Sequence, residues 1–354
     1  MLKYVIKRLL LIIPTMLLVS LFVFLLVNIT PADPGRIKLG ADAPQAAVDQ
    51  INHELGVDRP ILVRYANWVK DLFHGDMGKS YFTNKDVLQE LLTRFPNTLK
   101  LALLGLISAI IVGVPLGVLC AVKQYSVADY TLSTLAMFLA AMPAFWISLL
   151  LLLVFSSRLG WFPAFGSGSW KHFVLPTIPL TLGYGAGYLR YTRTAMLDTI
   201  RQDYIRTARA KGCSESRVIW RHAFRNSMLT VVTITGLSFA GLLGGAFVAE
   251  SVFSLSGVGM MGINAIYRRD MPQILASLMT IGSMFMIIMV IVDIMYAVLN
   301  PRIRSMYTAG SRLKAMKKAA MKAPVKTAEE IAAMPDPVRP EGYTDLFEGG
   351  EAHE

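Results

Sequence analysis

The chain has 354 residues, of which 54% are hydrophobic and 17% are charged, and its mean hydropathy is +0.49. This composition excludes a large soluble protein and indicates a membrane protein. The net charge of +11 would suit nucleic acid, but the basic residues lie beside long apolar runs, so we attribute them to membrane topology and expect no nucleic-acid partner.

The chain begins with a basic flank and a long uncharged run. Lys3, Lys7 and Arg8 precede an uncharged run over residues 9–29. A secretory signal is the alternative, but the run is longer than a typical signal core and no small-residue cleavage pattern follows it. About 20 apolar residues cross the hydrocarbon of a bilayer, so residues 1–29 are predicted to hold a retained first span.

Residues 30–98 are balanced in charge, with eight basic and nine acidic residues, as expected outside the membrane. A first amphipathic helix is predicted between Pro60 and Gly75, with these apolar residues on one face: Ile61, Tyr65, Trp68, Val69, Leu72 and Phe73. A second apolar stripe is formed by Val87, Leu88, Leu91, Leu92 and Phe95. We expect both stripes to pack on the spans or on each other as a small external cap. A contact surface for an external binding protein is a second, compatible interpretation.

Five more uncharged runs follow, which brings the predicted spans to six; the five cover residues 101–122, 130–157, 173–189, 227–249 and 274–292. Residues 190–226 contain nine Lys and Arg against three Asp and Glu, and residues 302–326 contain eight against none. Short cytoplasmic loops carry such an excess, so both termini and the 190–226 loop are predicted to face the cytoplasm. The predicted fold class is an all-α membrane protein with six transmembrane helices.

The predicted spans offer no chemistry of their own. None of the six runs contains Asp, Glu, Lys, Arg or His. Proton- and sodium-coupled carriers generally need such groups near the midplane, and an intramembrane enzyme needs an acid–base pair or a metal-ligand cluster. The energy for any transport is therefore expected to enter from elsewhere, which suits an ATP-driven partner.

No residue is predicted to be catalytic or to bind a metal or a cofactor. Gly78-Lys79-Ser80 ends like a phosphate-binding P-loop, but that loop needs a glycine where this chain has Phe73. The two cysteines have no metal-site spacing.

The loop after the fourth predicted span is unusually rich in arginine. Residues 203–226 read DYIRTARAKGCSESRVIWRHAFRN, with Gly212 near the middle. Ser214 is a residue type that caps helix starts, and Glu215 suits the positive end of a helix. We predict two short helices joined by a glycine hinge and built to contact another protein. The alternative is a loop that is basic only because cytoplasmic loops usually are.

Residues 250–273 connect the fifth and sixth predicted spans and are rich in glycine. Gly257, Gly259 and Gly262 are expected to allow tight turns. We predict a short re-entrant or cap helix near the outer mouth of a pathway, with an ordinary surface loop as the alternative. The candidate outer-gate residues are Glu250, Phe253, Gly257 and Gly259.

The tail, residues 306–354, is basic first and acidic afterwards. Leu313, Met316, Ala320 and Met321 lie among basic residues and suggest an amphipathic helix on the anionic inner leaflet. Residues 327–354 have the composition of a disordered segment.

YIRTARAKG over residues 204–212, followed by RHAFRN over residues 221–226, resembles the cytoplasmic coupling loop of ABC importer permeases of the dipeptide, oligopeptide and nickel group. The general permease pattern has Glu-Ala-Ala before the glycine, where this chain has Arg206-Thr207-Ala208. It ends in a proline, where this chain has Arg225. Both departures resemble the peptide branch of the family. The resemblance extends over about residues 1–305. It implies that the residues that couple to the ATPase are Tyr204, Arg206, Thr207, Ala208, Arg209, Ala210, Lys211, Gly212, His222, Arg225 and Asn226.

By this resemblance the chain is expected to have the type I ABC importer permease fold and to lie in a bacterial or archaeal cytoplasmic membrane. Its expected domains are residues 1–29, the external segment 30–98, a five-helix permease core 99–305 and the tail 306–354. The expected partners are a second homologous permease, two ATPase subunits that bind ATP and Mg, an extracytoplasmic substrate-binding protein and membrane lipid. The expected substrates are peptides, with di- and oligopeptides first, while nickel chelates and other small solutes, which members of this group also carry, stay open. A self-contained channel or secondary carrier is the alternative.

Glycine pairs four residues apart occur in three of the predicted spans: Gly113 and Gly117, Gly183 and Gly187, and Gly241 and Gly245. Small residues at this spacing let helices approach closely in lipid. They predict tight helix packing, which can include packing against a second permease.

Overall fold

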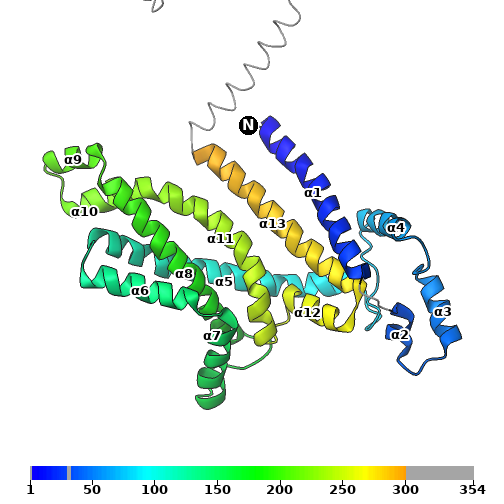
Figure 1. The fold of residues 1–354 in the computed structure, drawn as a ribbon. Coiled ribbons are helices and arrows are strands. Elements are labelled where there is room, and N and C mark those ends of the chain that lie inside the picture. The colour runs from blue at the N-terminus through cyan, green and yellow to red at the C-terminus, as the bar shows by residue number, and fades with distance from the viewer. Residues whose placement is uncertain (1, 30–32, 300–354) are drawn as a thin grey trace, which may run out of the picture. The chain divides into compact units, whose positions relative to one another are not determined.

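The computed structural model describes residues 2–29 and 33–299, which are mostly helical (Figure 1). The first helices in the chain are α1 (Leu2–Ile29), α2 (Pro34–Leu39), α3 (Gln45–Glu54), α4 (Ile61–Phe73), α5 (Val87–Val122), α6 (Val127–Ala141), and α7 (Ala144–Leu151) with its π-helical continuation η1 (Leu152–Arg158). They are followed by α8 (Lys171–Ile200), α9 (Asp203–Ala210), α10 (Glu215–Arg217), the π-helical segment η2 (Val218–Phe224), α11 (Arg225–Val252), α12 (Val258–Arg268) and α13 (Met271–Leu299). The amphipathic helix and the disorder predicted for the tail lie outside the described residues.

Four helices of the described residues are long and apolar enough to cross a membrane, over Leu10–Asn28, Val87–Val122, Thr230–Val252 and Met271–Val292. The run 173–189 lies inside α8, which is long but is not among these four, since polar residues and glycines interrupt its apolar side chains. The all-helical architecture is therefore confirmed, and the count of six spans stays a prediction.

The third predicted span, over residues 130–157, is not one straight helix. The pair Val127–Ala141 and Ala144–Arg158 meets at an angle of 94°. Pro143 lacks a backbone N–H and disfavours the helical conformation of the residue before it. Met142 accordingly has an extended backbone, with ψ 132°, where α6 ends. The apolar composition of this run concealed the break.

Close helix packing centres on α8, which contacts α5, α6 and α11. A Cβ atom on Gly113 would overlap the carbonyl oxygen of Gly185, and one on Gly117 would lie 2.6 Å from the carbonyl oxygen of Leu189. The close approach predicted from this glycine pair is confirmed at the α5–α8 crossing. A Cβ atom on Gly241 would lie 2.8 Å from the Tyr184 hydroxyl.

The other predicted pair behaves differently. A Cβ atom on Gly183 would have no atom within 4 Å, and one on Gly187 would meet only Tyr191 at 4.0 Å. These two glycines make no close helix contact within the described chain. Packing of their surface against a second permease stays a prediction.

The first amphipathic helix of the 30–98 segment forms as predicted. It begins after Pro60 and ends before Gly75, which has a φ of +80°. Tyr65 and Trp68 pack against Phe24 of α1 and against the start of α13, and the Tyr65 hydroxyl donates to the Leu17 carbonyl oxygen at 2.8 Å. The packing of this stripe on the long helices is confirmed for Tyr65 and Trp68, whereas Ile61 and Phe73 of the same stripe are exposed.

The second apolar stripe is not a separate helix. It forms the first turns of α5, which runs without interruption from Val87 to Val122. Val87 and Leu91 are buried against Met261 of α12 and Ala276 of α13. The expectation that this stripe packs on the spans is therefore confirmed for Val87 and Leu91, whereas Leu92 of the same stripe is exposed.

Candidate functional site

The 203–226 loop folds as a helix, a tight turn and a second helix. Gly212 has a φ of +74°, in the left-handed region that favours glycine. The amide of Gly212 donates to the Arg209 carbonyl at 2.9 Å, and the amide of Cys213 donates to the Ala208 carbonyl at 3.2 Å. These two bonds are those of a Schellman motif, which ends α9 and satisfies its last carbonyls. The predicted glycine hinge between two helices is present.

Two details of the prediction are wrong. Ser214 has the extended backbone of a capping residue, but its side chain makes no capping hydrogen bond. The second helix is also not short, because α10, η2 and α11 follow one another without a gap from Glu215 to Val252. A π-helical stretch within a long helix, as in η2, is frequent at functional sites.

A small apolar core holds the 203–226 loop against the long helices. Ile205, Val218 and Ala223 are completely buried. They pack with Val118 and Ala121 at the end of α5 and with Met196 of α8. The loop is therefore attached firmly to α5 and α8.

Polar contacts tie the two halves of the loop together across the turn. The Arg209 side chain donates from Nε to Glu215 Oε1 at 2.7 Å. The Asn226 side chain donates from Nδ2 to the Tyr204 hydroxyl at 2.9 Å and to the His222 carbonyl at 3.0 Å. Because Arg209 and Glu215 are substantially exposed, their ion pair contributes little to the stability of the fold, and it mainly orients the turn.

The structure presents most of the predicted coupling residues at the surface of the loop. Ala208 and His222 are half-buried, and the exposed ones are Tyr204, Arg206, Thr207, Arg209, Ala210, Lys211, Gly212, Arg225 and Asn226. The sequence-based interpretation missed Trp220, whose side chain is 54% exposed and whose ring meets Phe224 edge-on, with 5.2 Å between centroids. An exposed tryptophan among arginines has the composition of an interface anchor. Tryptophan within an otherwise basic loop was the signal available in the sequence.

At the other end of the helical run that starts at Glu215, a carboxylate is completely buried. Glu250 Oε1 accepts a hydrogen bond from the Thr98 hydroxyl at 2.6 Å, and Glu250 Oε2 accepts one from the Met260 amide at 3.0 Å. The Thr98 hydroxyl oxygen in turn accepts from the Val258 amide at 2.9 Å. Glu250 and Thr98 therefore satisfy the free amides at the start of α12 and hold it to α5 and α11.

Three of the four candidate gate residues, Glu250, Gly257 and Gly259, lie together. Phe253 is buried, and a Cβ atom on Gly257 would overlap the Glu250 carboxylate. One on Gly259 would lie 2.8 Å from Cα of Phe247. The predicted short helix is α12, but the reason given for the glycines is wrong. Gly257 is extended with φ −116°, so the glycines serve the close approach of α12 to α11 rather than tight turns.

Gly257→Ala is expected to loosen this contact and to lower the midpoint of thermal unfolding of the purified chain by on the order of 5 °C. The added methyl group would displace the Glu250 carboxylate and break its hydrogen bond from the Met260 amide. The matched control is Gly244→Ala on α11, where a Cβ atom meets nothing within 4 Å. Equal midpoints for the two variants would contradict the assigned role of Gly257.

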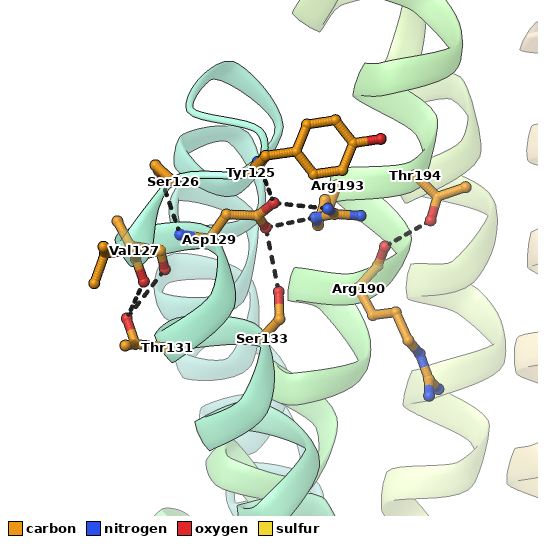
Figure 2. A network of polar contacts seen from close by, with 10 residues as sticks. Tyr125, Ser126, Val127, Asp129, Thr131, Ser133, Arg190, Arg193 and Thr194 are labelled. Carbon is orange, nitrogen blue, oxygen red and sulfur yellow. Dashed lines mark hydrogen bonds and ion pairs between the residues drawn. The ribbon is translucent and has the colours of Figure 1, made fainter.

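A partly buried ion pair joins the start of α6 to α8 (Figure 2). Arg193 donates from Nε to Asp129 Oδ1 at 2.6 Å and from a terminal nitrogen to Oδ2 at 2.7 Å, and Oδ2 also accepts from the Tyr125 amide at 3.0 Å. The Asp129 side chain is 2% exposed. Such a bidentate pair fixes the relative orientation of the two side chains in addition to pairing their charges. Arg190, one turn before Arg193, points away from the pair in Figure 2.

The ion pair was missed because each partner lies just outside an apolar run. Next to it, between α6 and α8, is a cavity of about 380 Å³ whose lining includes Met137, Gly183, Gly187 and Arg190. Gly183 and Gly187 of α8, which contact no other described helix closely, thus face this cavity.

Within residues 2–29 and 33–299, no group of three His, Cys, Asp or Glu side chains is placed to hold a metal ion.

Comparisons with known proteins agree with this architecture. The family described as the binding-protein-dependent transport system inner membrane component matches residues 113–305, and the corresponding N-terminal family matches residues 1–102. The chain is 39% identical over 304 residues to the glutathione transport system permease protein GsiC of Escherichia coli (strain K12) and to that of Salmonella choleraesuis (strain SC-B67). Each alignment covers 86% of this chain and 99% of the relative.

Among solved structures, a chain of the inward-facing MetNI methionine ABC transporter is similar with a TM-score of 0.53 at 17% identity, covering 60% of this chain and 97% of that one. A second crystal form of the same transporter gives a TM-score of 0.52, also at 17% identity. At this identity the likeness concerns the fold alone, and the fold is the predicted one of an ABC importer permease.

Proposed function

The chain belongs to the family of binding-protein-dependent transport system inner membrane components, and on that premise we propose that it forms part of the translocation pathway of an ATP-driven importer of peptides. As a member of this family it is a multi-pass protein of the cytoplasmic membrane and a non-catalytic permease subunit, while the ATPase resides in separate subunits.

Di- and oligopeptides are the proposed substrates. Relatives that are 39% identical over nearly their whole length are glutathione permeases, and glutathione is a small peptide. This supports a peptide-like substrate class without selecting one member of it.

The proposed assembly contains a second homologous permease, two ATPase subunits that bind ATP and Mg, and an extracytoplasmic substrate-binding protein. The exposed, arginine-rich surface of the 203–226 loop supports docking to the ATPases on the cytoplasmic side. The open glycine surface of α8, beside the cavity between α6 and α8, is available to a second membrane subunit.

One observation carries the proposed coupling: a single helical run leads from the 203–226 loop to the buried Glu250. It begins at Glu215, two residues after Cys213 of the turn, and ends at Val252. At about 1.5 Å per residue this run is longer than the roughly 30 Å of membrane hydrocarbon. Movement of the loop is therefore transmitted to the start of α12 without passing through a flexible connection.

In the proposed cycle, ATP closes the ATPase dimer, which moves the 203–226 loop and opens the pathway outward, and hydrolysis resets it. Changing a population from mostly one state to mostly the other requires a differential free energy on the order of 5 kcal/mol. ATP binding and hydrolysis can supply this amount. The ion pair between Asp129 and Arg193 links α6 to α8, which leads directly to α9, so α6 is expected to move with the loop.

Purification of the chain from its native membrane in mild detergent tests the proposal. We expect a second permease and P-loop ATPases to be recovered with it, and the ATPases to be lost from an Arg206→Ala, Trp220→Ala double variant, because both side chains lie on the exposed face of the loop. Arg59→Ala in the external segment is the charge-matched control and should retain the ATPases. A chain that purifies alone, and moves solute in vesicles without ATP, would establish the channel or carrier alternative.

A further inference from the structure

A second cavity, of about 460 Å³, is lined by residues at the end of α1 and the start of α13 and by residues of α4 and α12. The membrane-spanning stretches Leu10–Asn28 and Met271–Val292 both reach their limit here, at Asn28 and Met271. The cavity therefore lies at the boundary between hydrocarbon and lipid head groups. Its volume is within the range of small-molecule sites in proteins.

The lining of this cavity is divided into an apolar wall and a polar rim. The wall is aliphatic and comes from the two long helices; it contains Val23, Leu26, Val27, Ile274 and Leu278. The rim contains Asn28, Arg64, Tyr81 and Arg269. None of the lining residues is an Asp or a Glu. A ligand that fits this division has an apolar chain and an anionic head.

Arg64 supplies a positive charge that the described part of the chain does not neutralise with an ion pair. This residue of α4 is half-buried, and its guanidinium donates to the thioether sulfur of Met271 at 3.8 Å, a weak acceptor. Within residues 2–29 and 33–299, no carboxylate lies within ion-pair distance of it. Tyr81 is a further residue of the rim, and burial raises its pKa, so its hydroxyl stays neutral and is able to donate a hydrogen bond.

The apolar wall is continuous with the lipid-facing surface of the protein. α1 packs against α13 and α4, and only 11% of its membrane-spanning window is buried within the chain. Leu26 and Leu278, which line the cavity, are 49% and 38% exposed. An acyl chain can therefore enter from the surrounding leaflet without crossing a polar barrier.

We propose that this cavity binds one anionic phospholipid of the leaflet at which α1 ends and α13 begins. An acyl chain lies against the aliphatic wall, and the phosphate lies at Arg64 with the Tyr81 hydroxyl as a further donor. Arginine pairs with phosphate through parallel N–H bonds, and the Met271 thioether is readily replaced as an acceptor. The bound lipid joins α1 and α13 to the external helix α4.

Native mass spectrometry of the purified complex with added phosphatidylglycerol tests this site. We expect one phosphatidylglycerol to remain bound to the wild type, and Arg64→Gln to weaken its retention about fivefold, as expected from the loss of one basic contact to an anionic lipid. Lys70→Gln is the matched control, since Lys70 is exposed on the same helix and lines none of the cavities described above. Phosphatidylcholine, whose quaternary ammonium offsets the phosphate charge, should be retained less well than phosphatidylglycerol by the wild type.

Two further arms separate a lipid site from a simple anion site. Leu26→Trp enlarges an already exposed side chain of the wall and should displace the lipid, while an excess of inorganic phosphate should not. Retention of phosphatidylglycerol by Arg64→Gln at the wild-type level would overturn the proposal, and so would displacement by phosphate alone. Recovery of the ATPases with Arg64→Gln is measured in the same sample, so that failure of the lipid site is distinguished from failure of the proposed transport function.

Discussion

Gly212→Val is expected to lower ATP-driven uptake about tenfold while the chain still reaches the membrane in normal amounts. A left-handed backbone costs an ordinary L-residue roughly 1–2 kcal/mol, and about 1.4 kcal/mol corresponds to a factor of ten in population. Gly212 has a φ of +74° and ends α9 through the Schellman motif. The variant therefore disfavours the arrangement of the 203–226 loop that is proposed to dock on the ATPase.

The control for this prediction uses the open space around Gly212. A Cβ atom there meets nothing within 4 Å, so a new side chain is disfavoured by backbone conformation and not by a clash. Gly212→Asn should keep most of the uptake, because asparagine tolerates the left-handed region better than other residues. The test is uptake measured in vesicles with ATP inside. Equal losses of uptake in the valine and asparagine variants would rule out a conformational cause.

Gly117→Leu is expected to prevent correct folding rather than to impair coupling. A Cβ atom at this position would lie 2.6 Å from the Leu189 carbonyl oxygen and 2.7 Å from Cβ of Thr192. The obstacle includes backbone, which cannot rotate away, so the cost should exceed the roughly 1–3 kcal/mol typical of overpacked cores. The expected result is aggregated or degraded protein, measured by size-exclusion chromatography of detergent extracts.

Gly244→Leu provides the comparison for that variant. It introduces the same side chain into another long helix, at a position where a Cβ atom meets nothing within 4 Å. This variant should elute as the wild type does. A Gly117→Leu protein that elutes and melts like Gly244→Leu would show that α5 and α8 do not cross as closely as described.

The sequence was sufficient for features that depend on local chemistry. Pro60 and Gly75 set the limits of α4, and Gly212 set the turn of the 203–226 loop, since proline and glycine act through their own backbone conformations. Apolar run length likewise predicted α1 and α13. In each case the signal and the structure lie within the same few residues.

Features that depend on distant partners could not be predicted in this way. Asp129 and Arg193 are 64 residues apart, and neither has a local pattern that identifies the other. Glu250 was chosen for its place in the 250–273 connection, but its bond to Thr98 spans 152 residues, and only the fold explains why the carboxylate is buried. The same limit explains why the three glycine pairs with identical spacing differ in how closely they contact other helices. The spacing does not specify which helix, if any, faces the pair.

The two cysteines of the chain differ in accessibility, and this makes the native sequence suitable for spectroscopy. Cys120 is completely buried in α5, whereas Cys213 is half-buried, immediately after Gly212 in the 203–226 loop. Thiol reagents need access to the sulfur, so a fluorophore or spin label is directed to Cys213 without any engineered substitution. The label would then report, at a single known position, the moment at which another protein covers the turn.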